Sequence, residues 1–122
     1  MPRNYNQANC FGYALRKNKW LHVWCFLDVL NGEVGEEKII YELQNRYGLK
    51  PVKKEDMVLG KEYVAFRWSD EDYHFARRSK SGQWSHKQGS WTPEAMSTKE
   101  VFDEVWVNGY IHYTSDIFLF EA

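Results

Sequence analysis

Two histidines and one cysteine are the residues of this chain whose types and spacing are suited to covalent chemistry. His74 and His86 lie twelve residues apart, on either side of the polar segment Lys80-Ser-Gly82. A thiol nucleophile such as Cys10 needs a base to take its proton. An imidazole base needs a partner on its second ring nitrogen, which fixes its tautomer and orientation. The three side chains therefore predict a Cys-His-His catalytic set, provided that the fold brings them together.

The two histidines fall in segments with the composition of adjacent antiparallel strands. Residues 73–79 and 83–87 are predicted to form a hairpin around Lys80. If the turn centres on Lys80, His74 pairs directly with His86, and directly opposed residues point to the same face with Cβ atoms about 5 Å apart. A shift of one residue would place the two rings on opposite faces. We therefore expect the imidazoles to lie within hydrogen-bonding distance of each other.

Cys10 follows Asn9, a residue type that often caps a helix, and we expect a short helix over residues 10–17. At a helix N-terminus the macrodipole and the free backbone N–H groups favour a thiolate. The backbone N–H of Cys10, together with a side-chain amide, could hold an oxyanion. Gln7 is the preferred amide, and Asn6 and Asn9 are the alternatives.

The other elements predict an α+β fold, with N-terminal helices packed on an antiparallel β-meander. Residues 20–30 are strongly apolar and are expected to be a buried helix or an irregular packed stretch. Residues 35–47 have the clearest helical periodicity, ending at Gly48. Strands are expected at 62–68 and within 110–120. Residues 88–99 are expected to be a loop, and 98–107 are ambiguous.

Length and composition limit the class of protein. The chain has 122 residues and is predicted to be one domain, 1–122, whose core is rich in aromatic rings. Its net charge of −1 argues against a nucleic-acid partner, and no apolar run is long enough to span a membrane. The N-terminus lacks the apolar core of a secretory signal. We therefore expect a cytoplasmic protein, or one delivered by a phage particle or a secretion system, and a monomer.

Several candidate residues have competing structural roles. Asp72 lies two residues before His74 on the same strand face, where it could orient an imidazole or cap a turn. Cys25 is expected in the core; its alternatives are a disulfide with Cys10 or a zinc site with His22, Cys10 and a sheet histidine. Trp84, Trp91 and Trp106 could pack in the core or line a groove. Arg77, Arg78, Lys80 and Lys87 are expected to form a solvated basic patch.

Three short motifs together resemble those of the papain-like cysteine hydrolases, in particular their compact NlpC-like branch. They are Asn-Cys-Phe-Gly at 9–12, Asp-Tyr-His-Phe at 72–75 and Trp-Ser-His-Lys at 84–87. In that branch a cysteine at a helix start is followed by a histidine that opens a strand, and often by a second histidine about a dozen residues later. The same motifs are similar to a pattern in small uncharacterised bacterial and phage-associated proteins.

The resemblance implies a cysteine hydrolase or acyltransferase that acts on an amide, isopeptide or ester bond without a cofactor or metal. A peptidase or amidase is the first expectation, with a peptide or peptidoglycan-like substrate. Glutamine deamidases and transglutaminases share the first half-reaction and stay open. The alternative is a non-catalytic binding or inhibitory protein on the same fold that acts on a host or partner protein.

Overall fold

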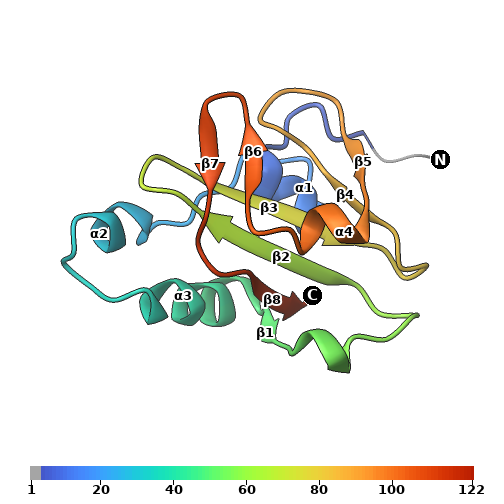
Figure 1. The fold of residues 1–122 in the computed structure, drawn as a ribbon, viewed down its shortest axis with the longest axis horizontal. Coiled ribbons are helices and arrows are strands. Elements are labelled where there is room, and N and C mark those ends of the chain that lie inside the picture. The colour runs from blue at the N-terminus through green and yellow to red at the C-terminus, as the bar shows by residue number, and fades with distance from the viewer. Residues whose placement is uncertain (1–3) are drawn as a thin grey trace.

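A six-stranded antiparallel sheet forms the centre of the fold (Figure 1). The computed structural model describes residues 4–122. The strand order is β1-β8-β2-β3-β4-β5, and a separate two-stranded sheet pairs β6 with β7. The strands are β1 Lys50–Pro51, β2 Tyr63–Trp68, β3 Tyr73–Arg78, β4 Trp84–His86, β5 Glu94–Met96, β6 Trp106–Asn108, β7 Ile111–Tyr113 and β8 Phe118–Glu121. The described residues therefore have a mixed α+β architecture, as the sequence predicts.

Short helices surround this sheet. They are α1 Cys10–Ala14, α2 Phe26–Leu30, α3 Glu37–Tyr47 and α4 Thr98–Val101, with a 3₁₀ turn at Lys54–Asp56. The longest, α3, buries Ile39 and Leu43 and ends at Gly48, whose φ of 70° only glycine adopts easily. This confirms the prediction for residues 35–47. In residues 4–122 no helix has the length and apolar character needed to cross a bilayer.

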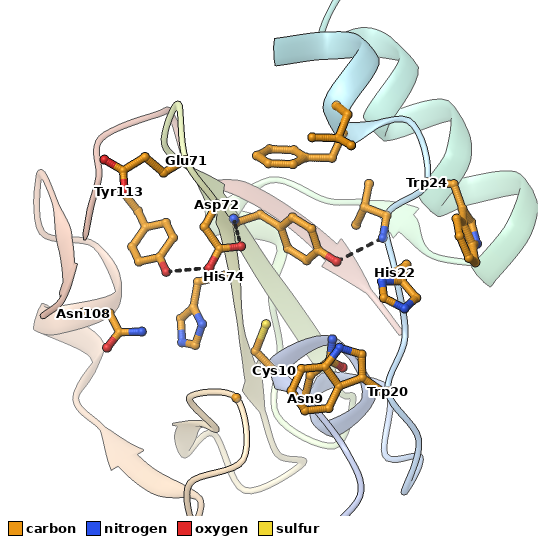
Figure 2. Close-up of a pocket in the computed structure, with 15 residues that line it drawn as sticks. Asn9, Cys10, Trp20, His22, Trp24, Glu71, Asp72, His74, Asn108 and Tyr113 are labelled. Atoms are coloured by element: carbon orange, nitrogen blue, oxygen red, sulfur yellow. Dashed lines mark hydrogen bonds between the residues drawn. The ribbon is translucent and has the colours of Figure 1, made fainter. Parts of the chain in front are cut away.

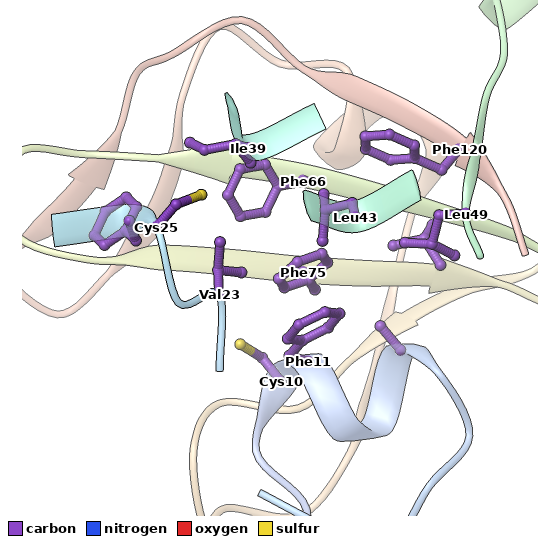
Figure 3. Packing of buried hydrophobic residues seen from close by; sticks show 13 residues of the cluster. Cys10, Phe11, Val23, Cys25, Ile39, Leu43, Leu49, Phe66, Phe75 and Phe120 are labelled. Carbon is purple, nitrogen blue, oxygen red and sulfur yellow. The ribbon is translucent and has the colours of Figure 1, made fainter. Parts of the chain in front are cut away.

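Each face of the sheet has its own apolar cluster. On one face, α1, α2 and α3 cover the aromatic side chains of β2 and β3, and Phe11, Phe66 and Phe75 pack there (Figure 3). On the other face, a second cluster includes Trp84 and Trp106. Rings dominate the first cluster, as the composition predicts. Trp84 and Trp106 are thus core residues, whereas Trp91 is 70% exposed.

The hairpin that carries the two histidines has a register two residues away from the predicted one. Ala76, not His74, lies opposite His86, and Arg78 lies opposite Trp84. The turn therefore includes Gly82, which has a φ of 91°. Because the shift is an even number of residues, His74 and His86 still point to the same face of the sheet, as diagonal neighbours.

Several predicted elements differ from the observed ones. The first helix stops at Ala14, and only Phe26–Leu30 of the apolar stretch 20–30 is helical, with exposed Trp24 and Leu27. The expected loop 88–99 contains β5, and the ambiguous segment 98–107 divides into α4 and the start of β6. The meander is limited to β2 through β5, because β8 inserts between β1 and β2. The order of strands in the sheet thus depends on the distant pairing of β8 with β1 and β2.

Candidate active site

Cys10 and His74 line the same cavity, which has a volume of about 480 Å³ (Figure 2). Cys10 enters it from the start of α1 and His74 from β3. Trp20, His22 and Trp24 form part of the wall, and the carboxylates of Glu71 and Asp72 and the amide of Asn108 also line it. Two of the three predicted catalytic side chains therefore share one cavity, although they lie more than sixty residues apart in the sequence.

The start of α1 is fixed by its cap and by a ring stack. Asn9 Oδ1 accepts a hydrogen bond of 2.9 Å from the Gly12 backbone N–H, which is the predicted N-cap. Phe11 stacks on Phe75 of β3, with ring centroids 4.3 Å apart and planes 4° from parallel. Gly12 is required because a Cβ there would overlap the Lys19 carbonyl oxygen. These contacts hold Cys10 against the edge of β3.

The Cys10 thiol is protonated in this state of the site. Its side chain is 8% exposed, and burial raises its pKa to about 12. The Asp72 carboxylate raises this pKa further, while the backbone N–H groups of Phe75, Phe11 and Cys10 itself lower it. The burial of Cys10 therefore opposes the thiolate that a helix start favours. Desolvation outweighs the N–H groups, and α1 has only five residues to build a dipole.

His74 and His86 form the ring contact that the sequence predicts. His74 Nε2 lies 2.9 Å from His86 Nδ1, and the ring planes are nearly perpendicular at 84°. If His74 donates its Nε2 proton to His86 Nδ1, its own Nδ1 has a free lone pair and can accept a proton. In that tautomer the contact with His86 orients the His74 ring and leaves Nδ1 as its acceptor nitrogen.

The environment of His74 keeps its ring neutral. The side chain is 4% exposed, and burial lowers its pKa from 6.5 to about 3, with the charge of His86 acting in the same direction. Burial also lowers the pKa of His86, against the carboxylates of Glu94 and Glu100, which raise it. The resting site is therefore a neutral thiol beside a neutral imidazole pair.

The three oxyanion candidates lie in different surroundings. Gln7 and Asn6 are exposed and are not among the residues that line the cavity. The backbone N–H of Gln7 donates to Asn18 Oδ1 at 2.7 Å. Asn9 lines the cavity, but its Nδ2 donates to the Leu21 carbonyl at 2.7 Å, so part of its donor capacity is already occupied.

Asp72 lies in the cavity wall and contacts groups other than the imidazoles. Its Oδ1 accepts the backbone N–H of Tyr73 at 2.8 Å, whereas the N–H groups of the turn itself, from Glu71 and Asp72, are accepted by Ser69 Oγ. Its Oδ2 accepts the Tyr113 hydroxyl at 3.4 Å. Within residues 4–122, no hydrogen bond joins Asp72 to His74 or His86. Its effect on the site is electrostatic, through the raised pKa of Cys10.

A buried carboxylate in α3 positions one wall of the cavity. Glu42 Oε2 accepts the Trp24 backbone N–H at 2.6 Å, and its Oε1 accepts the Cys25 backbone N–H at 3.1 Å. These N–H groups precede α2 and have no partner within that helix. In the sequence, Glu42 looks like any other polar residue of the predicted helix at 35–47. No local signal therefore marks it as a functional residue.

Lys87 is the residue near the site whose predicted role is wrong. It was expected in a solvated basic patch, yet it is 2% exposed. Its Nζ donates hydrogen bonds to the Ala8 and Gly89 carbonyls. The sequence around Lys87 gives no signal of this burial, because the Ala8 carbonyl that it binds lies 79 residues away in the chain.

Both cysteines are free and buried. Burial, together with the Glu42 carboxylate, raises the pKa of Cys25 to about 11. Within residues 4–122, no group of three or more His, Cys, Asp or Glu side chains is arranged to hold a metal ion. The zinc alternative with His22, Cys10 and Cys25 is thus not assembled in the described structure.

Comparisons with protein-family models, with curated proteins and with solved structures give no match to this chain.

Proposed function

We propose that this protein is a cysteine hydrolase or acyltransferase of papain-like type, with Cys10 as nucleophile, His74 as base and His86 as the group that orients His74. One observation carries the proposal. A thiol and an imidazole from distant segments line one cavity, and the imidazole contacts a second histidine at 2.9 Å through its Nε2, which leaves its Nδ1 for the role of base. That arrangement supports the order of roles in a nucleophile-base-orienter triad.

The proposed reaction begins with proton transfer. His74 Nδ1 takes the proton of Cys10 Sγ as the sulfur attacks the carbonyl carbon, and the π electrons move to the carbonyl oxygen. Collapse of this intermediate expels an amine or alcohol, which takes the proton from His74 and leaves a thioester on Cys10. Water or an amine then attacks the thioester, His74 again accepts a proton, and it returns that proton to the departing sulfur.

The substrate must enter a partly aromatic cavity. Trp20, Trp24 and Tyr73 provide flat apolar surfaces, while Asn108 provides an amide that can bond a peptide group. A peptide or a peptidoglycan-like acyl chain fits this mixture of apolar faces and polar groups. The peptidase or amidase outcome is the first candidate, and deamidation and transamidation use the same thioester.

The buried, protonated thiol favours a second candidate function. Cys10 is 8% exposed and its pKa is raised to about 12, which are the properties of a structural cysteine as well as of a resting nucleophile. In that case the protein is a binding or inhibitory module. The exposed side chains Trp20, Trp24 and Trp91 would then contact a host or partner protein.

The experiment that separates the two functions is the alkylation of Cys10 and Cys25, measured for each peptide by mass spectrometry. Cys25 is the matched internal control because it is also a buried, free cysteine with a raised pKa. Catalytic chemistry predicts faster labelling of Cys10 by iodoacetamide from pH 6.5 to 8.5. His74→Gln should reduce the Cys10 rate at least about tenfold and leave Cys25 unchanged, because general-base assistance contributes roughly 10²–10⁴-fold in catalysis.

Equal labelling of the two cysteines, with no effect of His74→Gln, would instead support the binding module. A panel of peptide, peptidoglycan and acyl-ester substrates with a Cys10→Ala control then identifies the acyl donor. Turnover that survives in the Cys10→Ala protein would exclude Cys10 as the nucleophile.

A further inference from the structure

Lys87 connects the segment before Cys10 to Gly89, a residue that lines the cavity. Its Nζ donates to the Ala8 carbonyl and to the Gly89 carbonyl, each at 2.5 Å. Ala8 lies two residues before Cys10, and Gly89 is among the residues that line the cavity with Cys10 and His74. The ammonium group thus joins the backbone just before Cys10 to a segment that lines the cavity.

The charge on Lys87 lacks a carboxylate partner in the described structure. In residues 4–122 the ion pairs join Arg16 to Glu62 and Lys61 to Glu121, and none includes Lys87. A buried ammonium without a counter-ion is costly, because backbone carbonyls replace only part of its hydration. The burial of this ammonium therefore points to a nearby group that becomes negative.

Cys10 is the nearby group that becomes negative during the proposed reaction. The two side chains interact electrostatically: burial lowers the pKa of Lys87, and the charge of Cys10 raises it. Alternative sources of positive charge at the site are weak. His74 is neutral at rest, and α1 has only five residues. Asp72 adds a negative charge, which disfavours the thiolate.

We propose that Lys87 is a positioning residue that supplies the positive charge for the anionic states at Cys10, first the thiolate and then the oxyanion formed by attack on a carbonyl. This inference rests on the proposed function. Its two carbonyl bonds hold the ammonium at a fixed place, so its electrostatic effect requires no rearrangement when the charge forms. His74 moves the proton, and Lys87 stabilises the negative charge that remains.

The test compares the rate of Cys10 alkylation by iodoacetamide in the full chain from pH 6.5 to 9 for three variants. Lys87→Gln keeps an amide donor for the two carbonyls and removes the charge, whereas Lys87→Arg keeps the charge. Lys80→Met is the matched control, since Lys80 is exposed on the adjacent turn. We expect the Lys87→Gln rate to fall about tenfold at each pH, equivalent to a shift of about one pH unit for loss of a neighbouring opposite charge.

Loss of the Lys87 charge and loss of its structural support should change the rate of Cys10 labelling in opposite directions. A purely structural role predicts that Lys87→Gln loosens the site, exposes Cys10 and speeds its labelling. A rate that rises or stays at the wild-type value therefore overturns the proposal. The Cys10 alkylation rates of Lys87→Arg and Lys80→Met should both stay within about threefold of the wild-type rate. If Lys87→Gln does not fold, as judged by circular dichroism and by rapid labelling of Cys25, Lys87→Met provides the uncharged comparison.

Failure of this inference is distinguishable from failure of the proposed function. If wild-type Cys10 is alkylated no faster than Cys25, and His74→Gln leaves the Cys10 rate unchanged, the proposed triad itself is wrong. If Cys10 depends on His74 and not on the charge at position 87, the triad stands and the role of Lys87 is rejected.

Discussion

Acidification should destabilise this protein through His74, because the folded state excludes the protonated form of that ring. His74 is 4% exposed, and burial lowers its pKa from 6.5 to about 3. Between these two values the unfolded chain binds a proton at His74 and the folded chain does not. Stability is therefore complete above pH 6.5 and decreases as the pH falls from 6.5 towards 3.

The magnitude follows from the two pKa values of His74, 6.5 and about 3. The value pH 4.5 lies two units below the His74 pKa of 6.5 in the unfolded state. Proton binding stabilises the unfolded state by about 1.36 kcal/mol for each of these units. A small part of this effect is already present at pH 7. The free energy of unfolding should thus fall by about 2.5 kcal/mol between pH 7 and pH 4.5 from this residue alone, which is a large fraction of the ~5–15 kcal/mol stability of a typical protein.

The assay is urea unfolding at both pH values, followed by circular dichroism and tryptophan fluorescence. The carboxylates also titrate in this range, so the contribution of His74 is the difference in pH dependence between the wild type and His74→Gln. His112→Gln is the matched control, since His112 is exposed on β7. The control should retain the wild-type decrease. An equal loss of stability in the wild type and in His74→Gln would show that His74 is hydrated and can be protonated in the folded state, and would refute this account of the site.

Two further predictions concern Cys10 and the cavity that it lines. Gly12→Ala should lower the free energy of unfolding by about 1–3 kcal/mol, measured in urea, because the new Cβ overlaps the Lys19 carbonyl; unchanged stability would mean that α1 can move away. The cavity is lined by Glu71 and Asp72 and by no Lys or Arg within the described residues. A cationic methanethiosulfonate should therefore modify Cys10 faster than an anionic one, by about threefold or more at low salt, and Asp72→Asn should reduce this ratio. Equal rates for both reagents would contradict this account of the cavity.

The parts of the site that the sequence predicts are those set by local pattern. Asn9 is a recognisable N-cap, and its bond to Gly12 is present. The shared face of His74 and His86 follows from strand periodicity, and it tolerates a register error of two residues because alternation repeats every two. The helix at 35–47 depends on its own apolar period and on Gly48.

The remaining features depend on contacts between distant segments, which local pattern does not contain. Lys87 follows a polar turn and resembles a surface lysine in sequence, yet the carbonyls of Ala8 and Gly89 make its burial possible. The pKa of Cys10 depends on how deeply α1 sits against β3, and that depth is set by the stack of Phe11 on Phe75. Desolvation of this kind cannot be derived from a residue's neighbours in the chain.

The observed register also explains how Cys10 and His74 come to line one cavity. β4 pairs with β3 only from Ala76 to Arg78, so the edge of β3 at Phe75 is left to α1, and the Phe75 N–H acts on the Cys10 thiol. The register expected from the sequence, with His74 opposite His86, would extend β4 alongside Phe75. The two rings would then be direct partners, but the strand would occupy the place of Cys10. The shift of two residues keeps the histidines in contact across a diagonal and opens the edge of β3, where Cys10 and His74 meet in one cavity.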